Sequence, residues 1–166
     1  EIIFGTEGDH LWLADQSGIA WQGFPVPVEN AIKSSPVIVK FQDSSLLVTG
    51  STDGSIYGFS MTGNLLFQVQ TGGVVYSDIS VLDFENTTKL FCGSDDGHVY
   101  AFDPLGVSSA GWPLDLGSSV LSPPVFADFN NDSVPEIIVG NSAGELHVLT
   151  LDGTSFPGFP IPLNGT

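Results

Sequence analysis

Short apolar runs alternate with glycine-containing turns along the whole chain, and this pattern occurs four times. A run of β-branched, aromatic or aliphatic residues ends at Gly5, Gly50, Gly93 and Gly140, and each of these glycines is followed 13 residues later by another glycine. Runs of this length and composition, bounded by Gly, Pro and Asp, are typical of β-strands. Because no segment carries the 3.6-residue apolar stripe of an amphipathic helix, the pattern predicts an all-β chain.

Each repeat contains four candidate strands. In the fourth repeat they are the apolar run before Asp128, the runs 136–139 and 146–149, and a proline-bounded run near the end. Turns such as Asp53-Gly54 suit tight hairpins, because glycine adopts a positive φ without steric cost. Four short antiparallel strands in a repeat of about 45 residues are typical of a β-propeller blade. The alternative architecture is a β-sandwich, whose turns do not repeat so regularly.

We therefore predict a partial β-propeller of about four four-stranded antiparallel blades. It forms a single segment over residues 1–166, with blade-like units at about 1–35, 36–76, 77–121 and 122–166. The first unit starts at its second strand, so we expect its blade to be incomplete. A partial ring exposes the flat faces by which blades pack. Head-to-tail self-association of two copies could close such a ring, and so could further sequence in a longer parent chain.

Composition then excludes several classes of partner. The chain has 19 acidic residues, three lysines and no arginine, which gives a net charge of −16. This charge opposes phosphate backbones, so we expect no nucleic-acid binding. Anionic membrane surfaces are disfavoured for the same reason, and no apolar stretch is long enough for membrane insertion. The single cysteine, Cys92, lies in an apolar run, which predicts a buried free thiol.

One loop carries candidate metal chemistry. Oxygen-bearing side chains stand at relative positions 1, 3, 5 and 9, and position 7 can offer a backbone carbonyl; these residues are Asp128, Asn130, Asp132, Glu136 and, at position 7, Val134. Ca²⁺ takes six to eight such oxygens at about 2.3–2.6 Å, whereas Zn²⁺ prefers the His and Cys ligands that this loop lacks. The pattern predicts one structural Ca²⁺ site. The alternative is an Asx-rich turn whose side chains cap their own backbone.

The fourth unit, from Ser122 through Gly140 to Gly158-Phe159-Pro160, resembles the FG-GAP/VCBS-type repeats of integrin-α-like β-propellers. The resemblance covers the chain at blade level, and its metal motif matches in this unit alone. It implies that the loop residues 128, 130, 132, 134 and 136 bind Ca²⁺ between the first two strands of a blade. It also implies an extracellular or cell-surface interaction module, often attached to a larger secreted protein.

Two other readings of the chain remain open. The segment Leu13–Trp21 resembles the Ala-x-Asp-x-x-x-Gly-x-x-Trp signature of quinoprotein propellers, although a carboxylate-rich quinone would favour basic partners that this chain lacks. The aromatic residues of the repeats could instead form a carbohydrate-binding platform, or they could fill the space between blades; they are Trp12, Trp21, Phe24, Tyr57, Tyr100, Trp112 and Phe159. Distant carboxylates could also hydrolyse a glycan. Neither a Gly-x-Ser-x-Gly motif nor a recognisable Ser-His-Asp set is present. We therefore expect a non-catalytic interaction or scaffolding module whose ligand is a protein or a glycan.

Overall fold

The computed structural model describes residues 1–163, which form fifteen strands in four antiparallel sheets. The first sheet contains three strands, β1 (Ile2–Gly5), β2 (His10–Ala14) and β3 (Val26–Pro27). The second contains β4 (Val37–Phe41), β5 (Ser44–Gly50), β6 (Ser55–Ser60) and β7 (Leu65–Gln70). The third contains β8 (Ser80–Phe84), β9 (Thr87–Gly93), β10 (His98–Phe102) and β11 (Leu114–Asp115). The fourth contains β12 (Val125–Ala127), β13 (Glu136–Gly140), β14 (Glu145–Leu149) and β15 (Ile161–Pro162).

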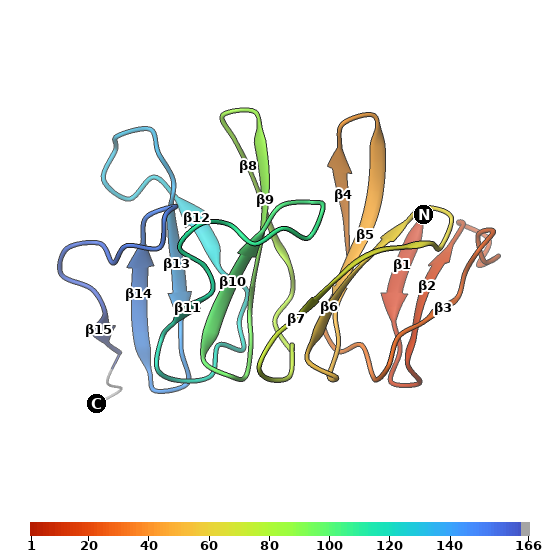
Figure 1. The fold of residues 1–166 in the computed structure, drawn as a ribbon, viewed down its shortest axis with the longest axis horizontal. Helices are drawn as coiled ribbons and strands as arrows, with labels where there is room; N and C mark the ends of the chain where they lie inside the picture. The colour runs from red at the N-terminus through yellow and green to blue at the C-terminus, as the bar shows by residue number, and fades with distance from the viewer. Residues whose placement is uncertain (164–166) are drawn as a thin grey trace.

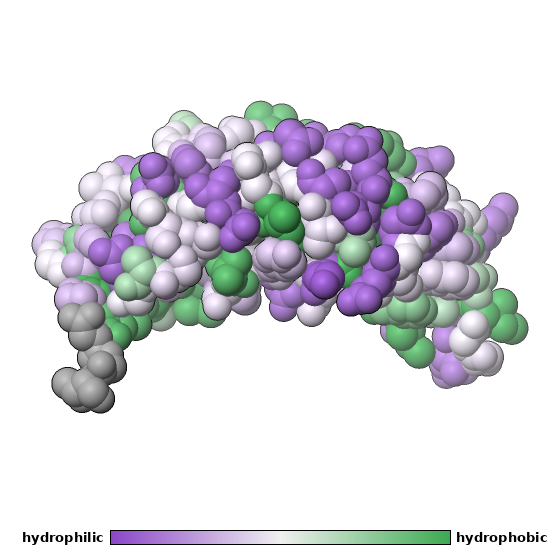
Figure 2. Space-filling model, turned by 90° about the horizontal axis from the view of Figure 1, so that it is seen from below, coloured by the Kyte–Doolittle hydropathy of each residue, from purple (hydrophilic) through white to green (hydrophobic). Residues whose placement is uncertain are grey.

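The four sheets stand side by side in chain order, and within each sheet the strands follow one another in sequence (Figure 1). Seen from below, the array curves into an open arch with hydrophobic residues at both ends (Figure 2). The N-terminus belongs to the sheet at one end of the arch and the C-terminal region to the sheet at the other (Figure 1). The prediction of an all-β, propeller-like array with an incomplete first sheet is therefore confirmed.

The hydrophobic core consists of three layers, one between each pair of neighbouring sheets. Successive side chains of a strand point to opposite faces of its sheet, so the second and third sheets contribute residues to the core layer on each side. In β5, Leu47 packs in the layer shared with the first sheet, whereas Leu46 and Val48 pack in the layer shared with the third. A continuous apolar run such as 46–48 therefore indicates a strand that is buried on both faces.

The leading glycine of each of the first three repeats lies under the linker that leaves its own sheet. A Cβ atom on any of these glycines would overlap a buried linker side chain: Gly5 lies under Ile32, Gly50 under Val75, and Gly93 under Val120. The repeat of glycine at these sites follows from this close approach of linker and strand.

The second glycine of each repeat closes a turn. Its φ lies between +78° and +86°, and its N–H donates to a carbonyl three residues earlier at 2.9–3.0 Å; these residues are Gly18, Gly63, Gly106 and Gly153. L-residues with side chains adopt this backbone conformation at a cost, which explains why glycine recurs at this site.

Cys92 is fully buried and unpaired, as predicted. Residues 1–163 contain no helix that is long and apolar enough to cross a lipid bilayer.

Candidate functional site

The candidate metal loop spans residues 128–135 and joins β12 to β13. In the second and third sheets the equivalent strands are joined by turns of only two residues, Gln42-Asp43 and Glu85-Asn86. The fourth sheet therefore has a connection that its neighbours lack, and the connection is rich in side-chain oxygen atoms.

Hydrogen bonds from backbone N–H groups shape this loop. The two carboxylate oxygens of Asp128 accept from the N–H groups of Asp132 and Ser133, each at 3.0 Å. The Asp132 N–H also donates to Oδ1 of Asn130 at 2.9 Å, and Oδ1 of Asp132 accepts from the Val134 N–H at 2.8 Å. Asn131 and Ser133 adopt positive φ values of 62° and 70°. The backbone of the loop thus folds back on the carboxylates of Asp128 and Asp132, which accept its hydrogen bonds.

Glu136 closes the loop from the first position of β13. Its side chain is buried, with 3% of the residue exposed. Its Oε2 accepts from the Phe129 N–H at 2.7 Å, and its Oε1 accepts from the Asn130 amide at 3.3 Å. The same amide nitrogen of Asn130 donates to Oδ2 of Asp132 at 2.9 Å. One amide therefore links two carboxylates.

The chemistry of these side chains fits a hard divalent cation. All their metal-binding atoms are oxygens, and none of the ion pairs in residues 1–163 involves Asp128, Asp132 or Glu136. A buried carboxylate without a cationic partner carries a large desolvation cost, which a bound cation would offset. The described residues do not, however, form a ready-made cage of three or more His, Cys, Asp or Glu side chains. Cation binding requires the Asn130 amide to turn its oxygen toward Asp132 and Glu136.

Of the predicted ligands, the structure brings together the side chains of residues 128, 130, 132 and 136 in one hydrogen-bonded loop. Val134 joins this network through its backbone N–H. Metal binding at these positions stays a prediction.

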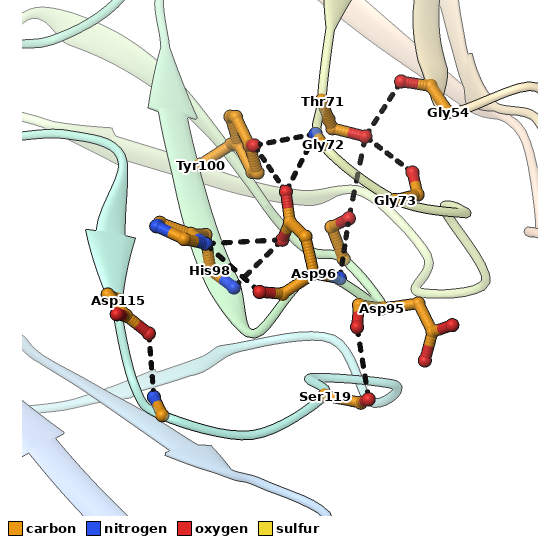
Figure 3. A network of polar contacts seen from close by, with 12 residues as sticks. Gly54, Thr71, Gly72, Gly73, Asp95, Asp96, His98, Tyr100, Asp115 and Ser119 are labelled. Atoms are coloured by element: carbon orange, nitrogen blue, oxygen red, sulfur yellow. Dashed lines mark hydrogen bonds and ion pairs between the residues drawn. The ribbon is translucent and has the colours of Figure 1, made fainter.

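A second polar cluster lies at the turns between β5 and β6 and between β9 and β10. The Tyr100 hydroxyl donates to Oδ2 of Asp96 at 2.6 Å, and the Tyr57 hydroxyl donates to Oδ2 of Asp53 at 2.7 Å. Oδ2 of Asp96 also accepts from the N–H of Gly72, which follows the second sheet (Figure 3). Asp96 and Tyr100 therefore fasten the third sheet to the second.

This environment shifts the pKa values of both partners. Burial and then the hydrogen bond to Asp96 raise the pKa of Tyr100 to about 12. For Asp96, burial favours the protonated form, but the hydrogen bonds from Tyr100, His98 and Gly72 outweigh it, and the net pKa is lowered. The pair is thus neutral tyrosine and charged aspartate near neutral pH.

The role of these aspartates was not predicted from the sequence, because the Asp-Gly pairs were interpreted only as turns. The signal is the spacing Asp-Gly-x-x-Tyr, which occurs at 53–57 and at 96–100. In the fourth sheet His147 takes the tyrosine's place, and its Nε2 lies 3.6 Å from Glu145 and 3.3 Å from the Asn141 amide. The residue at this repeated position therefore makes a polar contact with a residue of its own turn in three successive sheets.

The segment that resembles the quinoprotein signature, residues 13–21, forms a hydrogen-bonded turn. Oδ1 of Asp15 accepts from the N–H groups of Ser17 and Ile19, and the Trp21 N–H donates to the Leu13 carbonyl at 2.9 Å. Trp21 packs against the layer between the first and second sheets. The signature residues thus shape a turn that docks one indole ring.

The turns of the second and third sheets also enclose a shallow, largely apolar groove of about 430 Å³. Its walls include Phe41, Met61 and Leu66 from the second sheet, and Pro104 and Leu105 from the third. Leu105 is an exposed leucine in a turn where the other three repeats carry Ser17, Thr62 and Asp152.

Comparison with known proteins supports the fold and leaves the family open. No family model matches the chain, and no curated protein matches it. The similar solved structures include BBS1N in complex with ARL6DN (TM-score 0.66, 19% identity, 93% of this chain and 47% of that chain). They also include the computationally designed Ika8 protein (TM-score 0.64, 17% identity, 96% of this chain and 44% of that chain) and BamB from Moraxella catarrhalis (TM-score 0.53, 20% identity, 76% of this chain and 35% of that chain). The chain therefore has a β-propeller-like fold and spans half or less of the length of each of these structures.

Proposed function

We propose that this chain is a non-catalytic interaction and scaffolding module that binds a protein partner. The observation that carries the proposal is the array of four packed sheets with propeller-like neighbours, one of which, BBS1N, was crystallised with the protein ARL6DN. Repeat architectures of this kind offer extended binding surfaces. Each of the three histidines contacts a carboxylate of its own turn: His10 contacts Asp9, His98 contacts Asp96 and His147 contacts Glu145. These local contacts support a structural and not a catalytic role.

The proposed partner presents a basic surface. The chain carries a net charge of −16, so a cationic protein gains long-range attraction and a faster association rate. In keeping with the FG-GAP/VCBS resemblance, we place the module outside the cell or at the cell surface, as part of a larger protein.

We further propose that the 128–135 loop holds one structural Ca²⁺ ion. Asp128, Asn130, Asp132 and Glu136 would supply side-chain oxygens, and Val134 a backbone carbonyl. The ion would offset two of the three negative charges that the carboxylates of Asp128, Asp132 and Glu136 carry. The protein's own contribution is the set of backbone N–H contacts that orients the Asp128 and Asp132 carboxylates.

Calcium titration followed by thermal unfolding tests the metal proposal. At a calcium concentration near 100 times Kd, binding to the native state adds about 2.7 kcal/mol, or roughly 5–10 °C for a chain of this size. Chelator should reverse the shift, and Asp128→Ala should abolish it. Asp43→Ala, in the two-residue turn of the second sheet, is the matched control and should keep the full response. An unchanged melting temperature for the wild type in calcium and in chelator would refute the site.

The binding role is tested with immobilised protein against a panel of secreted and cell-surface ectodomains, in parallel with a glycan array. We expect saturable binding to at least one protein, weakening as sodium chloride rises from about 50 to 500 mM because opposite charges are screened. Saturable glycan binding without a protein partner would favour the carbohydrate-binding alternative. A new visible absorbance after quinone addition would favour the quinoprotein alternative.

A further inference from the structure

The apolar groove between the second and third sheets continues into a second hollow. The first hollow, of about 430 Å³, is the one described above, at the ends of β4, β6 and β10. The second hollow, of about 490 Å³, shares Phe41, Gln42 and Pro104 with the first. The walls that belong to the second hollow alone are polar: Asn86, Thr87, Thr88 and Asp103. Each of the two sheets packs against a neighbouring sheet on both sides, so this continuous groove lies in the middle of the array.

Two exposed leucines make the first hollow apolar. Leu66 of β7 is 55% exposed, and Leu105, in the turn after β10, is 62% exposed. The buried Leu46 and the partly buried Phe41 also line this hollow. The other three repeats carry polar residues at the position of Leu105, so the turn itself does not require a leucine. A ligand that covers these side chains gains free energy from the burial of apolar surface.

Asp103 gives the second hollow a negative charge. Its Oδ1 accepts hydrogen bonds from the N–H groups of Leu105 and Val107, each at 2.9 Å. No hydrogen bond or ion pair within residues 1–163 uses its other carboxylate oxygen, Oδ2. A second carboxylate, that of Asp83, accepts from the Thr88 hydroxyl of the same hollow at 2.6 Å. Oδ2 of Asp103 can therefore accept a hydrogen bond from a cationic side chain.

No lysine of residues 1–163 lines this groove, and the chain has no arginine. Phe41 packs toward the third sheet, so the side chain of the neighbouring Lys40 points to the opposite face of its sheet. Lys89 pairs with Leu82, which packs toward the fourth sheet, so Lys89 also lies on the face away from the groove. The remaining lysine, Lys33, lies in the linker that leaves the first sheet. The negative charge of the second hollow is therefore left for a partner to balance.

We propose that this groove binds an extended segment of a partner protein, with a large apolar side chain in the first hollow and a lysine or arginine side chain beside Asp103 in the second. The inference rests on the proposed function, because it names the site at which a basic protein partner is recognised. Burial of the apolar side chain supplies most of the affinity, since an ion pair at an exposed position contributes little. The carboxylate supplies selectivity for a basic segment and speeds its association.

Selection from a phage-displayed library of random short peptides tests the chemistry of the occupant. The wild-type protein is immobilised, and the selected peptides should combine a large apolar residue with a lysine or arginine. One selected peptide is then synthesised with a fluorescent label and titrated by fluorescence polarisation. Selection of acidic peptides, or of none that binds the protein in solution, would overturn the proposal.

Leu105→Ser tests whether the peptide lies in the first hollow. The first repeat carries Ser17 at this position, so the variant should fold, which its melting profile verifies. Loss of the apolar contact should raise the Kd of the peptide about tenfold or more. Val107→Ser is the matched control, because Val107 is 61% exposed in the same turn but lines neither hollow, and it should bind as wild type does. Equal affinity of the Leu105 variant and wild type would rule out this site.

Asp103→Asn tests the ion pair. The asparagine oxygen can still accept from the two backbone N–H groups, so the turn is retained while the charge is removed. The Kd should rise about two- to fivefold, in keeping with an exposed ion pair. Asp15→Asn is the matched control, since Asp15 accepts from Ser17 and Ile19 in the equivalent turn of the first sheet, and it should have no effect. An equal rise in Kd for both variants would mean that only the net charge of the chain matters.

The ectodomain panel separates this inference from the proposed function. Ectodomain binding that Leu105→Ser weakens supports the groove as the binding site. Ectodomain binding that both groove variants leave unchanged would keep the interaction module and refute the groove as its site. Absence of ectodomain binding would count against the proposed function, while the peptide titrations still decide whether the groove binds a basic segment.

Discussion

The contact between Asp96 and Tyr100 shows how one side-chain pair can join two sheets. The Tyr100 hydroxyl donates to Oδ2 of Asp96. The N–H of Gly72, in the linker after the second sheet, lies within hydrogen-bonding distance of both this carboxylate oxygen and the Tyr100 hydroxyl oxygen. Asp53 and Tyr57 form the same pair one sheet earlier. Because both partners are partly withdrawn from water, removing one leaves the other with an unsatisfied group.

Tyr100→Phe should therefore lower the free energy of unfolding by about 1–2 kcal/mol, the cost of leaving a partly buried acceptor unpaired. Chemical denaturation monitored by tryptophan fluorescence measures this change. Tyr76→Phe is the matched control, because Tyr76 is exposed, and it should have no effect. Equal stability of the Tyr100 variant and wild type would show that the contact contributes nothing.

The same pair predicts how stability depends on pH. The pKa of Tyr100 rises from 10.0 to about 12 on folding, so its contribution is complete below pH 10 and is lost as pH rises through 12. The pKa of Asp96 falls below 3.8 on folding, so its contribution is present above that value and is lost as pH falls through the lowered pKa. Urea unfolding across pH should show Tyr100→Phe flattening the alkaline decline and Asp96→Asn flattening the acid one. Parallel profiles for variant and wild type would contradict the assignment.

The sequence was sufficient to identify residues with candidate chemistry, but it was not sufficient to identify which residues they contact. The oxygen-bearing residues of the 128–135 loop were recognisable because their spacing is local. The contact from Asp96 to Gly72 spans 24 residues, and it exists only because two sheets pack together. Such a partner depends on the linker's path over the neighbouring turn, and a single sequence does not specify that path.

At the scale of elements, a leading glycine marks a strand end that a linker covers. A Cβ on Gly50 would overlap the Val75 side chain of the linker. A Cβ on Gly8, an exposed residue in the turn before β2, would meet only the Thr6 hydroxyl, at 3.9 Å, and the φ of Gly8 is not positive. The two glycines therefore differ in what surrounds them, and they form a pair for comparison.

Gly50→Ala should destabilise the protein by about 1–3 kcal/mol, because the linker has to move away from the strand. Gly8→Ala should be neutral or slightly stabilising, since it restricts the unfolded chain without a clash. Thermal unfolding of the two variants, compared with wild type, measures the difference. Similar losses in both would show that packing of the linker is not the reason for the glycine.

The elements themselves were largely predictable, and their lengths were not. The proline-bounded runs were expected to be full strands, but β3, β11 and β15 contain only two residues each. Each follows a Phe-Pro or Trp-Pro pair, and proline cannot donate to a ladder. The second repeat lacks this pair and forms the six-residue strand β7. The physical cause was visible in the sequence, but the number of paired residues depended on how the chain returns to the sheet.

At the scale of the whole molecule, repulsion among the acidic side chains lowers the stability of the folded state. The chain has 19 acidic residues and three lysines, and residues 1–163 contain just one lysine–carboxylate ion pair, between Lys33 and Glu7. Like charges held close together destabilise the folded state, and added salt screens them. The unfolded chain is more expanded and gains less from screening.

Raising sodium chloride from about 20 to 200 mM in the presence of chelator should therefore increase the melting temperature by roughly 2–4 °C, equivalent to about 1 kcal/mol for a chain of this size. Differential scanning calorimetry measures the shift, and the chelator removes any contribution from calcium. A decrease with salt would mean that attractive ion pairs outweigh the repulsion.

The number of sheets and the incomplete first one were predictable from the repeat, because the spacing of the glycines counts the units. The curvature of the arch was not, since it depends on how much side-chain volume each inter-sheet layer contains. Residues such as Phe91 and Trp112, whose rings lie 5.6 Å apart between the third and fourth sheets, set that volume only after packing.

The outer strand of the second sheet, β7, is longer than the outer strands β3, β11 and β15, and it presents an extended sheet edge at which fibrils could grow. The Thr71 N–H donates to the Gly54 carbonyl, so the alternation of an antiparallel ladder directs the backbone groups of Gln68 and Gln70 away from β6. No proline interrupts this edge, and glutamine-bearing strands with free backbone groups are templates for amyloid-like stacking. In concentrated solutions of this protein, intermolecular aggregation should begin at β7, and a proline or lysine placed there should delay it.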